Sequence, residues 1–336
     1  MTTLADVAAR AGVSVSAVSR VLSDHPSARV SDGTRERIRI AARELDYRPN
    51  FAGRALKSAR TQVLGLVMPH LTNAVVTDLV DGVEDEARDQ GYMLLLSRSG
   101  AARPSEEVIA RLVGEGRVDG VLLQYGDYAE PADLTGLFNT NAPVTTVDAV
   151  VDDRIGSAVL DDAHGARVAT EHLLELGHAR IGMVSGLPTT YTARRREEGF
   201  RETMREAGFA VDPSHVTHLG YRHDQGKLAL QQIVDTGNPP TALVVADVDA
   251  AIGVVAEARA LGVRVPQELS VVSVHDSSNA ENTWPPLTTV KMPFYELGRV
   301  AVRTLITRLK NGVVVNEVVD DPAPTLVVRE STGRIS

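Results

Sequence analysis

Short, strongly apolar runs alternate with amphipathic stretches through most of this chain, and that alternation restricts its fold more than any other feature. The first run, VLGLVMP from Val63, is continuous, as in a strand buried on both faces. Similar runs return at Tyr92–Leu96, Val118–Leu123, Val144–Val147, Ile181–Val184, Ala242–Ala246 and Leu269–Val274. Between most of them lie helical stretches: Val75–Gln90, Glu106–Gly114, Gly165–Leu176, Arg194–Ala207, Gln225–Val234 and Asp249–Leu261. This α/β pattern predicts parallel sheets covered by helices on both faces, and about 270 residues of it are enough for two lobes.

The first 22 residues have a different pattern, that of two short helices joined by a tight turn. Thr3 and Asp6 form a capping box at the start of the first helix, and Gly12 supplies the positive φ that ends it. The expected inward faces carry Leu4, Val7, Ala8, Ala11, Val18, Val21 and Leu22. The outward face of the second helix carries Val15, Ser16, Ser19 and Arg20. Residues of these kinds are presented by a DNA recognition helix, although two helices of any small bundle could share the pattern.

A third helix and a short basic segment follow. Ser31 is the predicted N-cap of the third helix, whose outer face carries Arg35, Arg37, Arg39 and Arg43. Pro49 ends this helix by restricting the residue before it. Residues 51–62 are helix formers with several basic side chains, but the segment is too short to be a stable helix alone. It is therefore a candidate hinge that folds when something holds it.

The net charge of −9 argues against nucleic acid binding, but the charges are unevenly distributed. Residues 1–60 contain 11 Lys and Arg against 6 Asp and Glu, whereas the remainder contains 24 against 38. A small basic segment on a large acidic body suggests a DNA-binding module joined to a domain with another task.

The sequence predicts a cytoplasmic protein that does not interact with membranes. It contains no cysteine, which excludes disulfides and thiolate metal sites and suits a reducing compartment. Its N-terminus opens into a polar, capped helix rather than the apolar core of a signal peptide. No apolar run approaches the ~18 residues that a membrane span requires.

Several blocks of the sequence resemble the lactose-repressor (LacI/GalR) family of bacterial transcription regulators, in order and at suitable spacing. Near the N-terminus these blocks are TLADVAARAGVSVSAVSRVLS, VSDGTRERIRIAARELDYRPN and RALKSARTQVLGLVMP. Farther on they are GARVATEHLLELGHARIGMVSG, RRREEGFRETM and PPLTTVKMP. The resemblance implies a homodimer with an N-terminal DNA-binding head, a hinge helix, and a body shaped like a periplasmic sugar-binding protein.

The resemblance also implies a domain organisation. We expect a helix-turn-helix DNA-binding domain at residues 1–48, a hinge helix or linker at 49–61, and an effector-binding and dimerisation domain at 62–336. Its N-terminal subdomain should take in about 62–161 and 292–320, and its C-terminal subdomain about 162–291 and 321–336.

By the same resemblance, Val15, Ser16 and Arg20 occupy the recognition-helix positions that read base edges. Arg20 would be the strongest reader, because a guanidinium can pair bidentately with guanine O6 and N7. Ser16 can donate or accept and is less discriminating, while Val15 offers an apolar contact, for instance to a thymine methyl. Ser19 shares their face and completes the set of expected DNA contacts.

In the hinge, Leu56 matches the leucine that family members insert into the minor groove at the operator centre, with Lys57 beside it and Arg54 close by. Inserting such a side chain costs about a few kcal/mol because it unstacks a base step, and a larger protein–DNA contact offsets this cost. Without the surrounding match, Leu56 would be interpreted as a helix-packing residue. Gly53 stands where alanine is common and should cost the hinge helix up to ~1 kcal/mol, so hinge folding depends more on DNA.

An effector is expected between the lobes, because ligands of α/β folds bind outside the carboxyl ends of the strands. Arg196 matches the family arginine that grips ligand hydroxyls or a carboxylate, and Thr192 lies one helical turn before it. Asp247 is the first residue of a pair that is usually Asn-Asp in the family. The family's frequent ligand-binding aspartate falls at His275, with Asp276 next.

The remaining effector candidates leave the ligand class open. After Asn73 the family often has an aromatic residue, but here alanine and valine follow and remove that stacking platform. Tyr221 and Trp284 are candidate aromatic walls, and a packing role is the alternative for each. A sugar or sugar derivative is the expected effector, as in most of the family, and a purine or other metabolite acting as co-repressor is the alternative.

The sequence contains no catalytic constellation, so we expect no enzyme activity, cofactor or metal site. It has no GxSxG elbow, no HExxH and no GxGxxG after a strand. His215, His218 and His223 lack a neighbouring cysteine and fit a solvated polar loop better than a metal site.

The leading hypothesis is an effector-controlled transcription regulator, most often a repressor in this family, that binds a pseudo-palindromic operator as a homodimer. The alternatives are a small-molecule-binding protein of the periplasmic type without DNA readout and an enzyme on a similar two-lobed fold. A dimer is expected rather than a tetramer, because no leucine heptads follow the last strand near Leu326–Val328.

Overall fold

The computed structural model describes residues 2–22, 30–48, 60–69, 76–99, 106–124, 143–151 and 154–335. The chain divides into two compact units, residues 1–61 and residues 62–336, which we call the head and the body. Within the described ranges, no helix is both long and apolar enough to cross a membrane.

The described residues of the head form three helices: α1 (Leu4–Ala11), α2 (Val15–Leu22) and α3 (Asp32–Glu44). The capping box at Thr3 and Asp6 is present, and Gly12 ends α1 with φ 65°, as its pattern predicted. A small apolar core joins the helices and contains Val7, Ala8, Ala11, Val18, Val21, Ile38, Ala41 and Ala42. The predicted inward faces are therefore the ones that pack together.

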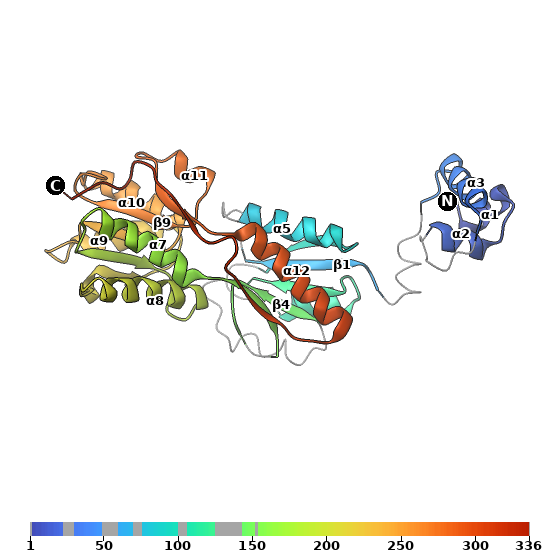
Figure 1. Cartoon of the computed structure of the whole chain (residues 1–336), viewed down its shortest axis with the longest axis horizontal. Coiled ribbons are helices and arrows are strands. Elements are labelled where there is room, and N and C mark those ends of the chain that lie inside the picture. Colours follow the sequence, from blue (N-terminus) through green and yellow to red (C-terminus); the bar gives the residue numbers. More distant parts are fainter. Residues whose placement is uncertain are drawn as a thin grey trace. The chain divides into compact units, whose positions relative to one another are not determined.

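The body contains two six-stranded sheets, each covered by helices (Figure 1). The sheet of the first lobe, the N-lobe, has the order β11-β5-β4-β3-β1-β2 with every pair parallel. Its strands are β1 (Val63–Met68), β2 (Met93–Arg98), β3 (Gly120–Leu123), β4 (Val144–Val147), β5 (Gly156–Leu160) and β11 (Asn316–Val319). Its helices are α5 (Val76–Asp89), α6 (Glu106–Gly114) and α12 (Phe294–Asn311).

The sheet of the second lobe, the C-lobe, has the order β12-β10-β9-β8-β6-β7, in which only the edge strand β12 runs antiparallel to its neighbour. Its strands are β6 (Ile181–Ser185), β7 (Val216–His218), β8 (Ala242–Val245), β9 (Ser270–Val274), β10 (Thr288–Lys291) and β12 (Thr325–Val327). Its helices are α7 (Asp162–Glu175), α8 (Tyr191–Glu206), α9 (His223–Val234), α10 (Val248–Ala260) and the short α11 (Ser278–Glu281).

The chain passes between the lobes three times: from β5 to α7, from β10 to α12, and from β11 to β12. One apolar core cluster contains residues from both lobes, such as Leu66 of β1 and Val274 of β9. The two lobes are therefore parts of one packed body with several connections at their junction.

Close helix crossings in the body depend on glycine. A Cβ at Gly253 of α10 would lie 1.9 Å from the carbonyl oxygen of His223, and one at Gly226 of α9 would lie 2.0 Å from that of Ala250. A Cβ at Gly82 of α5 would meet the carbonyl oxygen of Tyr295 at 2.0 Å. These helix pairs can approach so closely only because no side chain separates their backbones.

The sequence patterns predicted the main strands and helices, but the burial predicted for one strand is wrong and several elements were not predicted. The run at Tyr92–Leu96 looked like a buried strand, yet β2 is an edge strand with Met93 and Leu95 exposed. The structure adds β5, β7, β10 and β11, which are short and carry Gly, Ser, Thr, His or Asn instead of a continuous apolar run. It also adds α12, which returns the chain from the C-lobe to the N-lobe.

Candidate DNA-binding and effector-binding sites

The outward face of α2 is open for contact with another molecule. Val15 is 46 % exposed although it is apolar, and Ser16 and Arg20 are also exposed. Ser19 is half-buried. The Nε–H of Arg20 donates to the backbone oxygen of Ser16 at 3.2 Å, which steadies the side chain while its terminal N–H groups remain at the surface.

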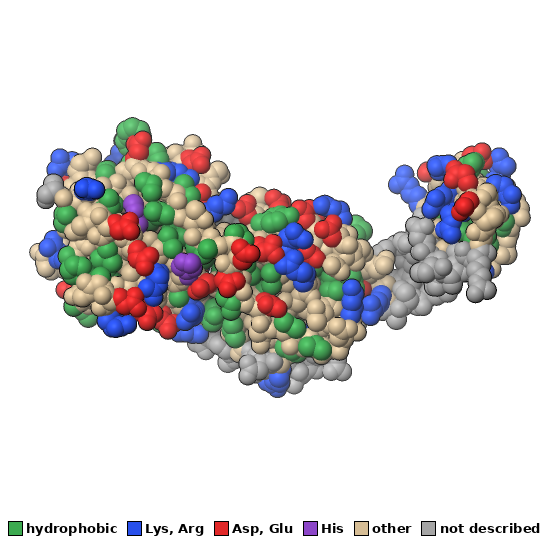
Figure 2. All heavy atoms as spheres, in the orientation of Figure 1, with side chains coloured by type: hydrophobic (Ala, Val, Ile, Leu, Met, Phe, Trp, Pro, Cys, Tyr) green, Lys and Arg blue, Asp and Glu red, His purple; other side chains and the backbone are tan. Residues whose placement is uncertain are grey.

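Acidic side chains are visible on both units, beside Lys and Arg on the body and among arginines on the head, and the visible surface of the head is rich in arginine side chains (Figure 2). Several belong to α3, and Arg43 of that helix pairs with Glu36 at 3.1 Å. Arg10 of α1 pairs with Glu44 at 2.7 Å. The hinge residues Arg54, Leu56 and Lys57 lie outside the described residues, as does the effector candidate Asn73.

A buried polar cluster lies in the C-lobe, at the carboxyl ends of β8 and β9. Its centre is Arg196 of α8, which is 1 % exposed. The Arg196 Nε–H donates to Asp162 at 2.7 Å, and its Nη1–H donates to the backbone oxygen of Ala246 at 2.7 Å. Its Nη2 lies 2.8 Å from Nε2 of His275. Burial alone would lower the pKa of Arg196, but Asp162 and other nearby charges outweigh it and hold the pKa above its ordinary value.

The partners of His275 determine its tautomer. Arg196 can only donate, so Nε2 of His275 must accept and the ring proton is on Nδ1. That Nδ1–H donates to Asp247 at 3.1 Å, and the other oxygen of Asp247 accepts from the backbone N–H of Asp249 at 2.8 Å. Burial, followed by the positive charge of Arg196, lowers the pKa of His275. The imidazole is therefore a neutral link between the guanidinium and Asp247.

Aromatic rings border this cluster on two sides. The Arg196 guanidinium lies 5.4 Å from the ring centroid of Tyr221, a cation–π distance. The Tyr221 hydroxyl lies 3.2 Å from Oγ1 of Thr192. The ring of Phe294 meets His275 edge-on with centroids 4.8 Å apart. A Cβ at Gly186 would lie 2.3 Å from the Tyr221 ring, so only glycine leaves the space this ring needs.

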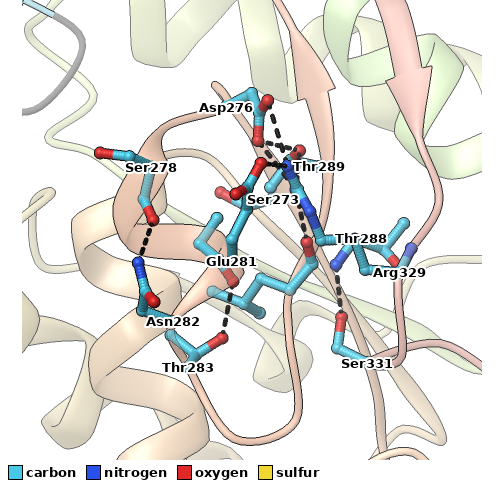
Figure 3. Close-up of polar contacts among 12 residues, drawn as sticks. Ser273, Asp276, Ser278, Glu281, Asn282, Thr283, Thr288, Thr289, Arg329 and Ser331 are labelled. Carbon is cyan, nitrogen blue, oxygen red and sulfur yellow. Dashed lines mark hydrogen bonds and ion pairs between the residues drawn. The ribbon is translucent and has the colours of Figure 1, made fainter.

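Of the effector candidates expected from the sequence, the structure brings Thr192, Arg196, Tyr221, Asp247 and His275 together. Two others are held elsewhere. The Asp276 carboxylate is directed away to Arg329, at 2.8 Å, and also accepts from Thr289 at 2.6 Å (Figure 3). Trp284 is 76 % exposed and lines a different hollow, next to Val255 and Pro266.

Asp162 is a member of the cluster that was not predicted from the sequence. It is buried at the start of α7, and its Oδ2 atom has no hydrogen-bond partner among the described residues. Its pairing with Arg196 joins residues 34 positions apart, which no local periodicity reveals. The available signal was the acidic pair at residues 161 and 162, directly after Leu160, the last residue of β5.

The arrangement is suited to binding. Within the described ranges, no group of three or more His, Cys, Asp or Glu side chains could hold a metal ion. Arg196 uses three of its five N–H groups on the protein, so two remain for a ligand. A three-helix head with an exposed recognition face and a two-lobed body with a buried arginine define a class: DNA-binding regulators built on a periplasmic-binding-protein-like body.

Comparisons with known proteins give the family within that class. Residues 3–50 match the model of bacterial regulatory proteins of the lacI family, and residues 170–332 match the periplasmic binding protein-like domain. The HTH-type transcriptional repressor PurR of Vibrio atlanticus is 30% identical over 314 residues, covering 93% of each chain. The chain therefore belongs to the LacI family, and is a DNA-binding transcription regulator rather than an enzyme.

Solved structures agree with this assignment. A lac repressor dimer bound to operator is similar with a TM-score of 0.84 and 27% identity, covering 99% of each chain. A complex of the transcriptional regulator CelR with cellobiose is similar with a TM-score of 0.74 and 29% identity, covering 98% of this chain and 100% of that one. The head and body found here thus occur together in regulators of known structure.

Proposed function

We propose that the protein represses transcription as a homodimer, with an affinity for operator DNA that a small-molecule effector controls from the cleft between the lobes. The observation that carries this proposal is the buried Arg196 cluster. Burying an arginine and its carboxylate partner is costly, and apolar residues of similar volume often stabilise a core better. A charged group at the carboxyl ends of parallel strands is instead well placed to bind a ligand.

The helix-turn-helix domain, residues 1–48 of the head, would read the operator in the cytoplasm. Two copies related by a two-fold axis suit a pseudo-palindromic sequence, with one α2 in each major-groove half-site. Val15, Ser16, Ser19 and Arg20 supply the base-reading face. In the hinge, residues 49–61, Leu56 would enter the minor groove, with Arg54 and Lys57 near phosphates.

The effector, bound by the domain at 62–336, is proposed to be a carbohydrate or a close derivative. Arg196 offers N–H donors, and the hydroxyls of Thr192 and Tyr221 can donate or accept, which suits a ligand rich in hydroxyls. The complex of CelR with cellobiose supports this class. A purine acting as co-repressor is the second candidate, favoured by the likeness to PurR.

The proposal is tested by sequencing the genomic fragments that the full-length protein retains at near-physiological salt, where non-specific phosphate binding is weak. A few sites that share one palindrome are expected. Each is then titrated with protein in the presence of ribose, cellobiose, adenosine or hypoxanthine. One compound should change operator affinity by about 5–150-fold, the usual range of allosteric coupling.

Other outcomes would contradict separate parts of the proposal. Binding of a compound by the body without any retained DNA sequence, with or without that compound, would favour a binding protein that does not read DNA. A specific operator whose affinity responds equally to a compound in wild type and in Arg196→Lys would place the effector away from Arg196. Chemical turnover of the compound would contradict a purely regulatory role.

A further inference from the structure

One carboxylate oxygen of Asp162 is buried without a hydrogen-bond partner. The Asp162 side chain is 0 % exposed, and its Oδ1 atom accepts from the Arg196 Nε–H at 2.7 Å. Its Oδ2 atom has no partner among the described residues. Arginine and a carboxylate often form two parallel hydrogen bonds that occupy both oxygens, but here a single bond leaves one oxygen over. Because burying a charged acceptor without a donor is costly, this oxygen is a candidate contact for a ligand.

The position of Asp162 is fixed by the packing of α7 against α8. Asp162 lies just after the carboxyl end of β5, where the chain crosses from the N-lobe to the C-lobe. The preceding residue, Asp161, is the N-cap of α7. A Cβ at Gly199 of α8 would lie 2.2 Å from the carbonyl oxygen of Ala163, so the start of α7 contacts the backbone of α8 directly. The carboxylate is therefore held beside Arg196, which belongs to the same helix as Gly199.

The Arg196 cluster carries more negative than positive charge. Arg196 contributes one positive charge, and the carboxylates of Asp162 and Asp247 contribute one negative charge each. His275 adds no charge, because its Nε2 atom accepts from Arg196 and its single ring proton is directed to Asp247. A ligand with a negative charge of its own would add to this excess.

The neighbouring arginines of α8 are engaged elsewhere. Arg194 donates to the backbone oxygen of Thr189 at 2.9 Å. Arg195 pairs with Glu198, one helical turn farther along α8. The positive charge of the cluster therefore comes from Arg196, which Asp162 already opposes at 2.7 Å.

We propose that the effector carries no negative charge and presents a hydrogen-bond donor to Asp162 beside an acceptor for Arg196. The two remaining N–H groups of Arg196 can only donate, and the free oxygen of Asp162 can only accept. A ligand that reaches the former comes next to the latter, because the two side chains are bonded to each other.

Neutral polar groups meet this requirement, and acidic groups do not. A sugar hydroxyl can accept from Arg196 and donate to Asp162, and a purine can offer ring nitrogen acceptors beside an N–H donor. A carboxylate or phosphate offers acceptors to Arg196 but places its charge against Asp162, and like charges brought together at a binding site oppose binding. Asp162 is therefore the residue that would reject sugar acids and phosphorylated compounds.

This inference rests on the proposed function and restricts its effector. The test titrates the full-length protein calorimetrically with three pairs of compounds: ribose and ribose 5-phosphate, cellobiose and cellobionate, and adenosine and adenosine monophosphate. We expect a neutral member of these pairs to bind and its acidic counterpart to bind about 100-fold more weakly. The sugar pairs and the purine pair distinguish the two sources of the required donor and acceptor.

Asp162→Asn tests whether this carboxylate carries the discrimination. The amide has the shape of the carboxylate but no charge, so the variant should bind the neutral compound on the order of 30-fold more weakly and discriminate less against its acidic counterpart. Asp161→Asn is the matched control, since it removes an equal charge one residue away and keeps a side chain that can cap α7. It should retain both the affinity and the discrimination of wild type.

Operator affinity, measured with each compound, separates this inference from the proposed function. An acidic compound that binds as tightly as its neutral counterpart and changes operator affinity would overturn the inference and leave the proposed function intact. Equal discrimination in wild type and Asp162→Asn would also overturn it. A neutral compound that binds with the expected discrimination but leaves operator affinity unchanged would support the inference and contradict effector control. Binding of none of the six compounds would contradict both.

Discussion

The Nη2 atom of Arg196 lies 2.8 Å from Nε2 of His275, and this contact sets the protonation state of a buried imidazole. Because arginine cannot accept, the histidine must, and its remaining proton is directed to Asp247. The guanidinium is in turn oriented from its other edge by Asp162. His275 is therefore a positioning residue for Arg196, since both of its ring nitrogens are occupied within the protein.

This arrangement predicts a pH dependence of stability. The folded-state pKa of His275 lies below 6.5, so the folded state binds fewer protons than the unfolded state near that pH. The stability it contributes is fully present above pH 6.5 and is lost as the pH falls toward the lowered pKa. We expect the difference in unfolding free energy between wild type and His275→Asn to shrink below pH 6.5, by at most about 1.4 kcal/mol per pH unit.

Asparagine is the chosen replacement because residue 275 has φ 72°, a left-handed conformation that asparagine tolerates. Urea unfolding at a series of pH values measures the difference. Burial also lowers the pKa of His172 and of His178. Both histidines are present in wild type and in His275→Asn, so their contributions cancel in the difference. A difference that does not change with pH would contradict the neutral assignment of His275.

Loss of the guanidinium should destabilise the body strongly. Arg196→Ala leaves Asp162 buried and unpaired, a change that typically costs about 3–5 kcal/mol. Arg195→Ala is the matched control, since Arg195 is adjacent on α8 but more exposed and pairs with Glu198 near the surface. Chemical denaturation should give a large loss for the first variant and no more than about 1 kcal/mol for the second. Equal losses of unfolding free energy in the two variants would mean that burial of an ion pair does not determine its contribution to stability.

The contribution of Asp249 to stability should change with pH in the opposite direction to that of His275. Burial and then the charge of Asp247 raise the pKa of Asp249 to about 6, from 3.8. The stability linked to its protonated form is present below pH 3.8 and lost as the pH rises through about 6. Asp249→Asn should therefore stabilise the protein at pH 7, by about 1–2 kcal/mol once solvent screening of this partly exposed group is allowed for.

The control for this prediction is Asp224→Asn on α9. Hydrogen bonding to Arg222 lowers the pKa of Asp224, so its removal should not stabilise the protein at pH 7. Thermal unfolding at pH 7 and below pH 4 distinguishes the two variants, since the gain from Asp249→Asn disappears at the lower pH. A gain that persists at low pH would have to come from something other than the carboxylate charge.

Sequence and structure agree best where the determinants are local. The capping box of Thr3 and Asp6 involves residues three positions apart, so it could be predicted, as could the helix end at Gly12. The hydrogen bonds of Arg196 could not be predicted in the same way, because their partners Asp162, Ala246 and His275 come from three other segments. Sequence neighbours can also diverge: His275 faces Arg196, whereas Asp276 is held by Arg329, 53 residues farther along the chain.

The crossing of α9 and α10 provides a packing test. A Cβ at Gly253 would lie 1.9 Å from the carbonyl oxygen of His223, so Gly253→Ala must force the two helices apart. Overpacking of this kind costs about 1–3 kcal/mol or more. Gly114→Ala in α6, where a Cβ meets nothing within 4 Å, should instead be neutral or stabilise by up to about 1 kcal/mol. A mild effect of Gly253→Ala on thermal unfolding would mean that the helices can separate at little cost.

Arg20 should make the most base-specific contact with the operator. Its terminal N–H groups are at the surface of α2, where they can pair with a guanine, so Arg20→Ala should cost about 1–3 kcal/mol of binding and relax preference at one position per half-site. Arg10→Ala is the control, because Arg10 belongs to α1 and pairs with Glu44, and it should leave base preference unchanged. Both variants are compared by competitive binding to a randomised operator library at one fixed salt concentration. An unchanged base preference in Arg20→Ala, at any affinity, would remove Arg20 from the base-reading face.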